Sequence, residues 1–256
     1  MAEDYAAINV YTAGYDTHFF AGVLNGAGAN LIDISTMLLE RVVSRKTRIK
    51  PVLFITHSLG GLIAKQMLRK ASEASSARRK RVIAETLGVV FVGTPHQGAQ
   101  LAKSINSALS IAASQQMKDL SYAHSALIDL SEWFRNWAPQ TKLQISSFYE
   151  VEHYKGVLVV DQVTANPNVL GCDPVALQAN HVDLVKLSDR KSQLYQSLNS
   201  TIDELIESQS IELSIVGDQS AQTLIVNGGA KPSHGGGVKA GQSGRGRGRS
   251  RSALFP

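Results

Sequence analysis

The chain has 256 residues, 43% hydrophobic and 18% charged, which is enough for one large domain with a sizeable core. No apolar run approaches the roughly 20 residues of a membrane-spanning helix, so we expect no such helix. A single cysteine, Cys172, excludes a disulfide scaffold, and together with an acidic rather than leader-like start it predicts a cytoplasmic protein.

The net charge of +5 is unevenly distributed. Residues 231–256 hold two Lys, four Arg and no acidic residue, which gives this tail +6. The other 230 residues keep 20 of the 26 basic residues against all 21 acidic ones, so their net charge is −1. Only the tail offers a case for RNA binding, through charge and guanidinium stacking. The favoured interpretation of the tail is a solubilising or mistranslated segment.

Composition divides the chain into three parts. Residues 1–207 contain the alternating apolar pattern of a folded domain. Residues 208–230 form a short β-prone segment with a central turn signal. Residues 231–256 are rich in Gly, Arg and Ser and are predicted to be disordered, because they bury too little apolar surface to offset the entropy of ordering.

The first part predicts an α/β fold. Buried strands are expected from five short apolar runs, at residues 8–11, 52–55, 89–92, 145–148 and 157–160. Helical spacing is found over residues 31–43, 62–68 and 192–206, and residues 99–138 predict two more helices. This order predicts an open, mostly parallel sheet with helices on both faces.

The most informative passage is T-H-S-L-G at residues 56–60, which lies between a predicted strand and a predicted helix. This is the context of a nucleophile elbow, in which Ser58 is held on a strained turn and the helix start faces developing negative charge. Thr56 replaces the usual first glycine and tightens the turn. The alternative is that Ser58 only caps the helix.

The residues 54–66 and the run 90–99, which contains V-G-T-P-H-Q-G, together resemble the lipase-like serine esterases of the α/β-hydrolase superfamily. The resemblance covers residues 8–198 and is closest to the branch of GPI-inositol-deacylase-like and "serine active site containing" proteins. Similar domains begin some fungal NACHT or NB-ARC proteins. The resemblance implies a catalytic triad in the chain order Ser, acid, His.

That order selects the general base. Of the seven histidines, only His181 and His234 follow the last predicted strand, and His234 lies in the tail. His181 is therefore the predicted base, with a surface-loop histidine as the alternative. We expect His57 to serve packing and turn geometry, and His96 to line the pocket.

The acid must lie between Ser58 and His181, just after a strand. Asp161 follows the predicted strand 157–160 and is the first choice for holding the imidazole in place. Glu150, after the preceding strand, and Asp173 are the other candidates. A turn-forming aspartate is the alternative interpretation of Asp161.

The oxyanion hole is predicted to be incomplete. Leu59, which follows the nucleophile, is expected to give one N–H. The resemblance implies a second donor from an upstream His-Gly loop, which this sequence lacks, so the chain is expected to begin one strand late. Loss of one donor costs roughly 10²–10³ in turnover, unless backbone near Gly14 or Gly22 replaces it.

These observations predict a serine esterase or lipase that cleaves a carboxylic ester through an acyl-enzyme. No spacing typical of a metal site or a phosphate loop is present, so no metal and no cofactor are expected. The predicted partner is an ester or lipid-like small molecule, with peripheral contact to a membrane left open. The competing hypothesis is a catalytically weak hydrolase-fold module that acts in sensing or interaction.

Overall fold

The computed structural model describes residues 8–13, 29–44, 51–96, 104, 107, 121–186 and 189–209. Contacts divide the chain into two compact units, residues 1–206 and 207–256. Of the second unit only residues 207–209 are described, so the predicted tail 231–256 and nearly all of the predicted segment 208–230 lie outside the described residues. The three-part division stays a prediction.

Four parallel strands form one sheet in the order β1-β2-β3-β4. The strands are β1 (Val52–His57), β2 (Thr86–Val92), β3 (Gln144–Glu150) and β4 (Val175–Leu177). The inner strand β2 pairs with β1 and β3, and six of its seven residues are buried. Burial on both faces explains why its sequence is a continuous apolar run rather than an alternating one.

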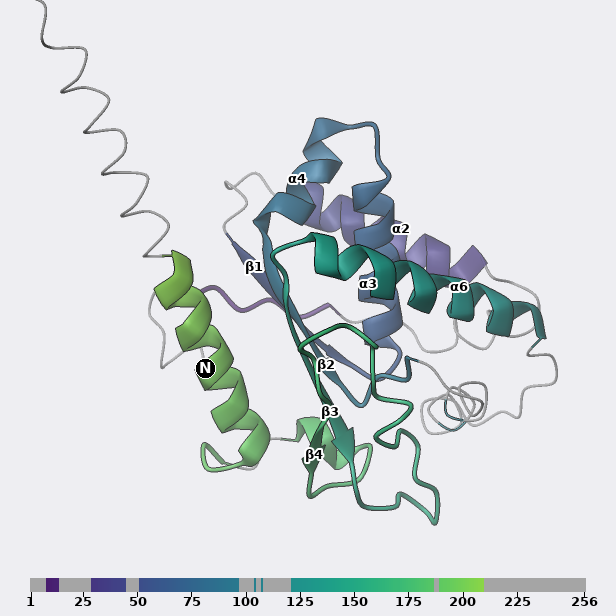
Figure 1. Cartoon of the computed structure of the whole chain (residues 1–256), viewed down its shortest axis with the longest axis vertical. Coiled ribbons are helices and arrows are strands. Elements are labelled where there is room, and N and C mark those ends of the chain that lie inside the picture. The colour runs from purple at the N-terminus through teal and green to yellow at the C-terminus, as the bar shows by residue number, and fades with distance from the viewer. Residues whose placement is uncertain are drawn as a thin grey trace, which may run out of the picture. The chain divides into compact units, whose positions relative to one another are not determined.

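Helices alternate with the first three strands along the chain (Figure 1). They are α2 (Ala29–Val43), α3 (Gly60–Ser72), α4 (Ala77–Glu85), α6 (Ser121–Trp137), the short 3₁₀ helices Ala138–Gln140 and Asp183–Val185, and an unlabelled helix over residues 193–209. Within the described ranges, none of these helices is both long and apolar enough to cross a bilayer.

The two faces of β2 build two parts of the core. Val89 and Phe91 lie in a cluster with side chains from α2, α3 and α6, including Leu39, Met67 and Phe134. The alternate residues Val90 and Val92 pack with Leu194 and Leu198 of the C-terminal helix. This alternation follows from the two-residue period of a strand. The predicted α/β fold, with a parallel sheet covered by helices on both faces, is confirmed.

Two predicted strands are wrong. Residues 8–13 belong to no strand, and Val10 and Tyr11 are mostly exposed rather than buried. Residues 157–160 are irregular apart from one bridge between Val157 and Tyr154, although Val159 and Val160 are fully buried. In this second case an apolar run is buried by loop packing, which sequence pattern does not distinguish from a ladder.

Two short elements were not predicted. The strand β4 has only three residues, Val175–Leu177, so its apolar run is too short to predict a strand. The helix α4 contains the basic cluster 78–81 and buries only Val82. The missed strand matters for the site, because the loop that follows β4 carries His181.

Candidate active site

Ser58 lies on a sharp turn between β1, which ends at His57, and α3, which begins at Gly60. Its φ of 53° is in the left-handed region, where a residue other than glycine is uncommon and strained. The Ser58 N–H donates to the Val92 carbonyl at 2.9 Å. The Thr94 hydroxyl donates to the Ser58 carbonyl at 3.0 Å. The strained turn is therefore held by the end of β2.

The residues around the turn have a steric reason. A side chain at Gly61 would collide with Thr94 and Phe91, so helix α3 can approach β2 only with glycine there. Thr56, in the place where the usual pattern has glycine, donates its hydroxyl to the Val90 carbonyl at 3.0 Å. The turn therefore accommodates this departure through a hydrogen bond to the neighbouring strand.

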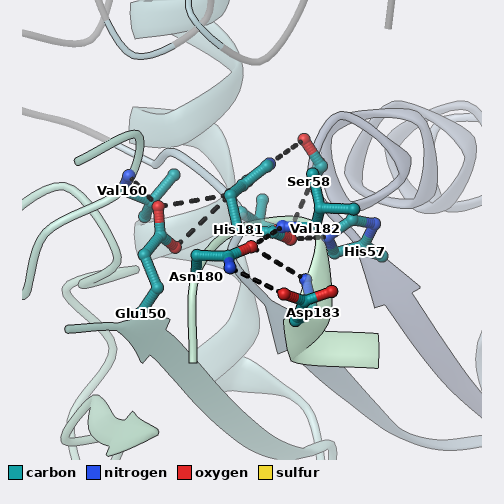
Figure 2. Close-up of polar contacts among 9 residues, drawn as sticks. His57, Ser58, Glu150, Val160, Asn180, His181, Val182 and Asp183 are labelled. Atoms are coloured by element: carbon teal, nitrogen blue, oxygen red, sulfur yellow. Dashed lines mark hydrogen bonds and ion pairs between the residues drawn. The ribbon is translucent and has the colours of Figure 1, made fainter. Parts of the chain in front are cut away.

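The His181 ring lies beside the Ser58 hydroxyl, with 2.9 Å between Nε2 and Oγ (Figure 2). The histidine is 2% exposed and lies in the loop between β4 and the 3₁₀ helix Asp183–Val185. Asn180 shapes this loop, because its side-chain oxygen accepts the N–H groups of Val182 and Asp183, each at 3.1 Å. The structure thus brings together two predicted residues that are 123 positions apart.

Glu150 lies on the other side of the His181 ring. It is the last residue of β3, it is fully buried, and its carboxylate is 3.3 Å from Nδ1 (Figure 2). One carboxylate oxygen also accepts the N–H of Val160 at 2.6 Å. A carboxylate at Nδ1 favours the tautomer with the proton on that nitrogen, which leaves Nε2 free to accept from Ser58.

Asp161, the first choice for the acid, is placed elsewhere. Its carboxylate accepts the N–H of Thr164 at 2.7 Å and closes a turn, and the structure gives it no contact with His181. Asp173 is exposed. The physical reason is the missing strand at 157–160: Asp161 follows a loop, whereas Glu150 stands at a true strand end. The signal for Glu150 was the apolar run 145–148 directly before it.

The turn also positions the Leu59 amide. Leu59 precedes the first residue of α3, so its N–H lies at the positive end of a 13-residue helix. Within the described residues this N–H donates to no backbone carbonyl. Gly14 and Gly22, considered for a second oxyanion donor, lie outside the described residues.

His57 and His96, the other two histidines considered from the sequence, differ in their contacts. His57 Nε2 lies 3.0 Å from the backbone carbonyl oxygen of His181. Burial, with the neighbouring His181 ring, lowers the pKa of His57. His96 is fully buried edge-on to Phe91, with ring centroids 4.6 Å apart, and burial holds its pKa well below the usual value.

Lys65 was not singled out from the sequence. It lies in α3, is fully buried, and its amine is 4.8 Å from the Phe134 ring centroid and 5.6 Å from that of Phe91. Burial lowers the pKa of Lys65 to about 7. Across the described part of the chain, no group of three or more His, Cys, Asp or Glu side chains could hold a metal ion.

The chain is similar to known proteins over the region that contains the Ser58 turn. The family described as "Putative serine esterase (DUF676)" matches residues 24–132, which include the Ser58 turn. Similar proteins include Protein SERAC1 of Homo sapiens, 29% identical over 202 residues, and Protein SERAC1 of Danio rerio, 28% identical over 204 residues. No solved structure matches the chain.

Each of these alignments covers 77% of this chain but 31% of the relative, so the chain spans about a third of the length of the curated relatives it matches. The proposed likeness to fungal NACHT or NB-ARC proteins stays a prediction. The family match and the relatives support a serine-esterase-like role. The match over residues 24–132 and the SERAC1 relatives therefore support the resemblance to lipase-like serine esterases that the two motifs predict.

Proposed function

We propose that this domain is a serine hydrolase that cleaves carboxylic esters through an acyl-enzyme, with Ser58 as nucleophile, His181 as general base and Glu150 as the carboxylate that orients the base. One observation carries the proposal: a chain of contacts that runs from the hydroxyl of the partly buried Ser58 through both ring nitrogens of the buried His181 to the buried Glu150. The arrangement matches the roles of a hydrolytic triad, in which the acid can be Glu as well as Asp.

The proposed first step forms the acyl-enzyme. Ser58 Oγ attacks the carbonyl carbon of the ester while its proton passes to His181 Nε2. Glu150 stabilises the imidazolium that results, and the same proton then goes to the leaving alkoxide oxygen. In the second step a water molecule attacks the carbonyl carbon of the acyl-enzyme while His181 takes its proton. His181 then returns that proton to Ser58 Oγ, which releases the carboxylic acid and the free serine.

The developing oxyanion needs N–H donors. The Leu59 amide at the start of α3 is the proposed donor, because it follows the nucleophile and lies at the positive end of the helix. No cofactor takes part in the proposed chemistry. An ester or lipid-like small molecule remains the proposed substrate class, and a cytoplasmic location with peripheral membrane contact remains a proposal.

The test is covalent labelling of the wild-type protein with a fluorophosphonate probe, together with hydrolysis of a short p-nitrophenyl ester. We expect labelling and turnover in the wild type and neither in Ser58→Ala. Mass spectrometry of the labelled peptide should place the adduct on Ser58. A folded wild-type protein that resists the probe would contradict the proposal and favour a module for sensing or interaction.

The tail calls for a separate experiment. RNA retention that is lost with increasing salt, and that vanishes when residues 231–256 are deleted, would support the predicted RNA contact.

A further inference from the structure

His57 precedes the proposed nucleophile in the chain, but its side chain contacts the His181 backbone and not Ser58. It ends β1, whereas Ser58 lies on the turn that follows. Figure 2 shows the two side chains pointing in different directions, with the His57 ring directed toward the backbone of the histidine loop. The ring centroids of His57 and His181 are 5.1 Å apart and tilted by 36°.

The contact fixes the protonation of His57. A backbone carbonyl can only accept a hydrogen bond, so His57 Nε2 must carry a proton to pair with the His181 oxygen at 3.0 Å. Burial and the adjacent His181 ring both lower the pKa of His57, so the ring is neutral near pH 7. Its Nε2 is committed to this bond, which leaves it no role as a base toward Ser58.

His181 is consequently held at two points. Glu150 contacts Nδ1 of its ring, and His57 contacts the carbonyl of its backbone. The first contact sets the tautomer and ring direction. The second ties the histidine loop to the end of β1, one residue before the nucleophile, so the base and Ser58 are anchored to the same strand end.

We propose that His57 is a positioning residue, which donates a hydrogen bond from Nε2 to the His181 carbonyl and thereby sets the distance between the His181 ring and Ser58. This inference rests on the proposed hydrolase function. A displacement of about 1 Å at a reacting pair can cost on the order of 10²-fold in rate. Loss of the His57 donor should therefore lower the reaction rate of Ser58 without abolishing the reaction.

The test compares two substitutions of His57, one that keeps the aromatic ring and one that keeps a hydrogen-bond donor. His57→Phe keeps an aromatic ring for packing and removes the donor. His57→Gln loses the ring but carries an amide nitrogen the same number of bonds from Cα. The readout is the second-order rate of fluorophosphonate labelling at Ser58, with thermal melts to verify folding and exposed His153→Phe as the matched control.

We expect His57→Phe to label about 10- to 100-fold more slowly than wild type, His57→Gln to regain most of that rate, and His153→Phe to match wild type. A packing role predicts the reverse order, with Phe milder than Gln. That order, or equal rates in all variants, overturns the inference while the proposed function stands. A wild-type protein that does not label overturns both.

Discussion

Two buried polar groups near the elbow differ in how their atoms are satisfied. Around Ser58, His181 and Glu150, hydrogen bonds link the hydroxyl, both ring nitrogens and the carboxylate, and Glu150 also receives a backbone N–H. Lys65 and His96 are buried as deeply, yet the Lys65 amine and both His96 ring nitrogens have no hydrogen-bond partner among the described residues. Their neighbours are aromatic rings.

The comparison shows that the free-energy cost of burying a polar atom depends on whether the atom has a hydrogen-bond partner. A buried polar atom with a partner costs little, whereas an unpaired one costs about 1–3 kcal/mol and a buried charge more. The first group therefore holds the buried His181 and Glu150 side chains in place at little cost in stability. The second group should lower the free energy of unfolding and contribute nothing to the chemistry. Each of the following variants separates these two effects.

The largest effect is expected at the acid. Glu150→Gln replaces the carboxylate that faces Nδ1 with an amide of the same shape, which no longer stabilises the imidazolium or enforces the tautomer. We expect kcat/KM for ester hydrolysis to fall about 10³- to 10⁴-fold. The matched control is Asp161→Asn, expected to change the rate by less than about threefold. If Asp161→Asn were the more damaging change, the assignment of Glu150 would be wrong.

Lys65→Met should raise the free energy of unfolding. The folded pKa of about 7 lies below the ordinary lysine pKa of 10.5, so the unfolded chain binds more protons between these pH values and stability rises with pH across that window. Lys65 therefore costs most at pH 7 and below, and little near pH 10.5. At about 1.4 kcal/mol per pH unit, we expect Lys65→Met to gain on the order of 3–4 kcal/mol at pH 7.

Chemical denaturation at pH 7 and pH 9.5 measures this gain. Exposed Lys80→Met in α4 is the control and should change stability at neither pH. A Lys65→Met protein that gains equally at both pH values would show that the buried amine stays charged between them, as it is in the unfolded chain, and that its pKa is not lowered.

Gly93→Ala tests the close packing of the Gly93 backbone against the His181 ring. Gly93 has a φ of 57°, and an added Cβ would lie 3.2 Å from the His181 ring and 2.9 Å from Leu184. Gly156→Ala is a matched control, because Gly156 also has a positive φ, 78°, but nothing within 4 Å of an added Cβ. Both should lose about 1–2 kcal/mol through backbone strain, and Gly93→Ala alone should slow labelling of Ser58, by about tenfold.

The smallest effect is expected for Thr94→Val, which removes the hydroxyl that holds the Ser58 carbonyl and keeps the side-chain shape. We expect a loss of about 1 kcal/mol in stability and a few-fold drop in labelling. Thr36→Val, which removes a comparable hydrogen bond at an exposed position of α2, should leave labelling unchanged. Equal labelling in both variants would show that the carbonyl contact does not support the turn.

The contact between Ser58 and His181 was predictable because its signals are local or ordered. Ser58 lies between an apolar run and two glycines, and His181 is selected by chain order. The contact of His181 with Glu150 rather than Asp161 was not the first choice, because residues 157–160 are apolar and partly buried without being a strand, so Asp161 does not stand at a strand end. Lys65 was missed because a charged residue in a predicted helix is normally assigned to the solvent-facing side.

The contact between the Glu150 carboxylate and the Val160 N–H joins the end of a strand to a point ten residues later. The chain between them makes a small exposed excursion closed by Tyr154 and Val157, with Lys155 and Gly156 at its tip. Homologous or engineered chains can therefore lengthen, shorten or replace that tip, even with a peptide tag, provided the returning backbone delivers an amide to the same oxygen. Insertions should no longer be tolerated from Val159 onward, because the buried segment that donates the Val160 N–H to Glu150 begins there.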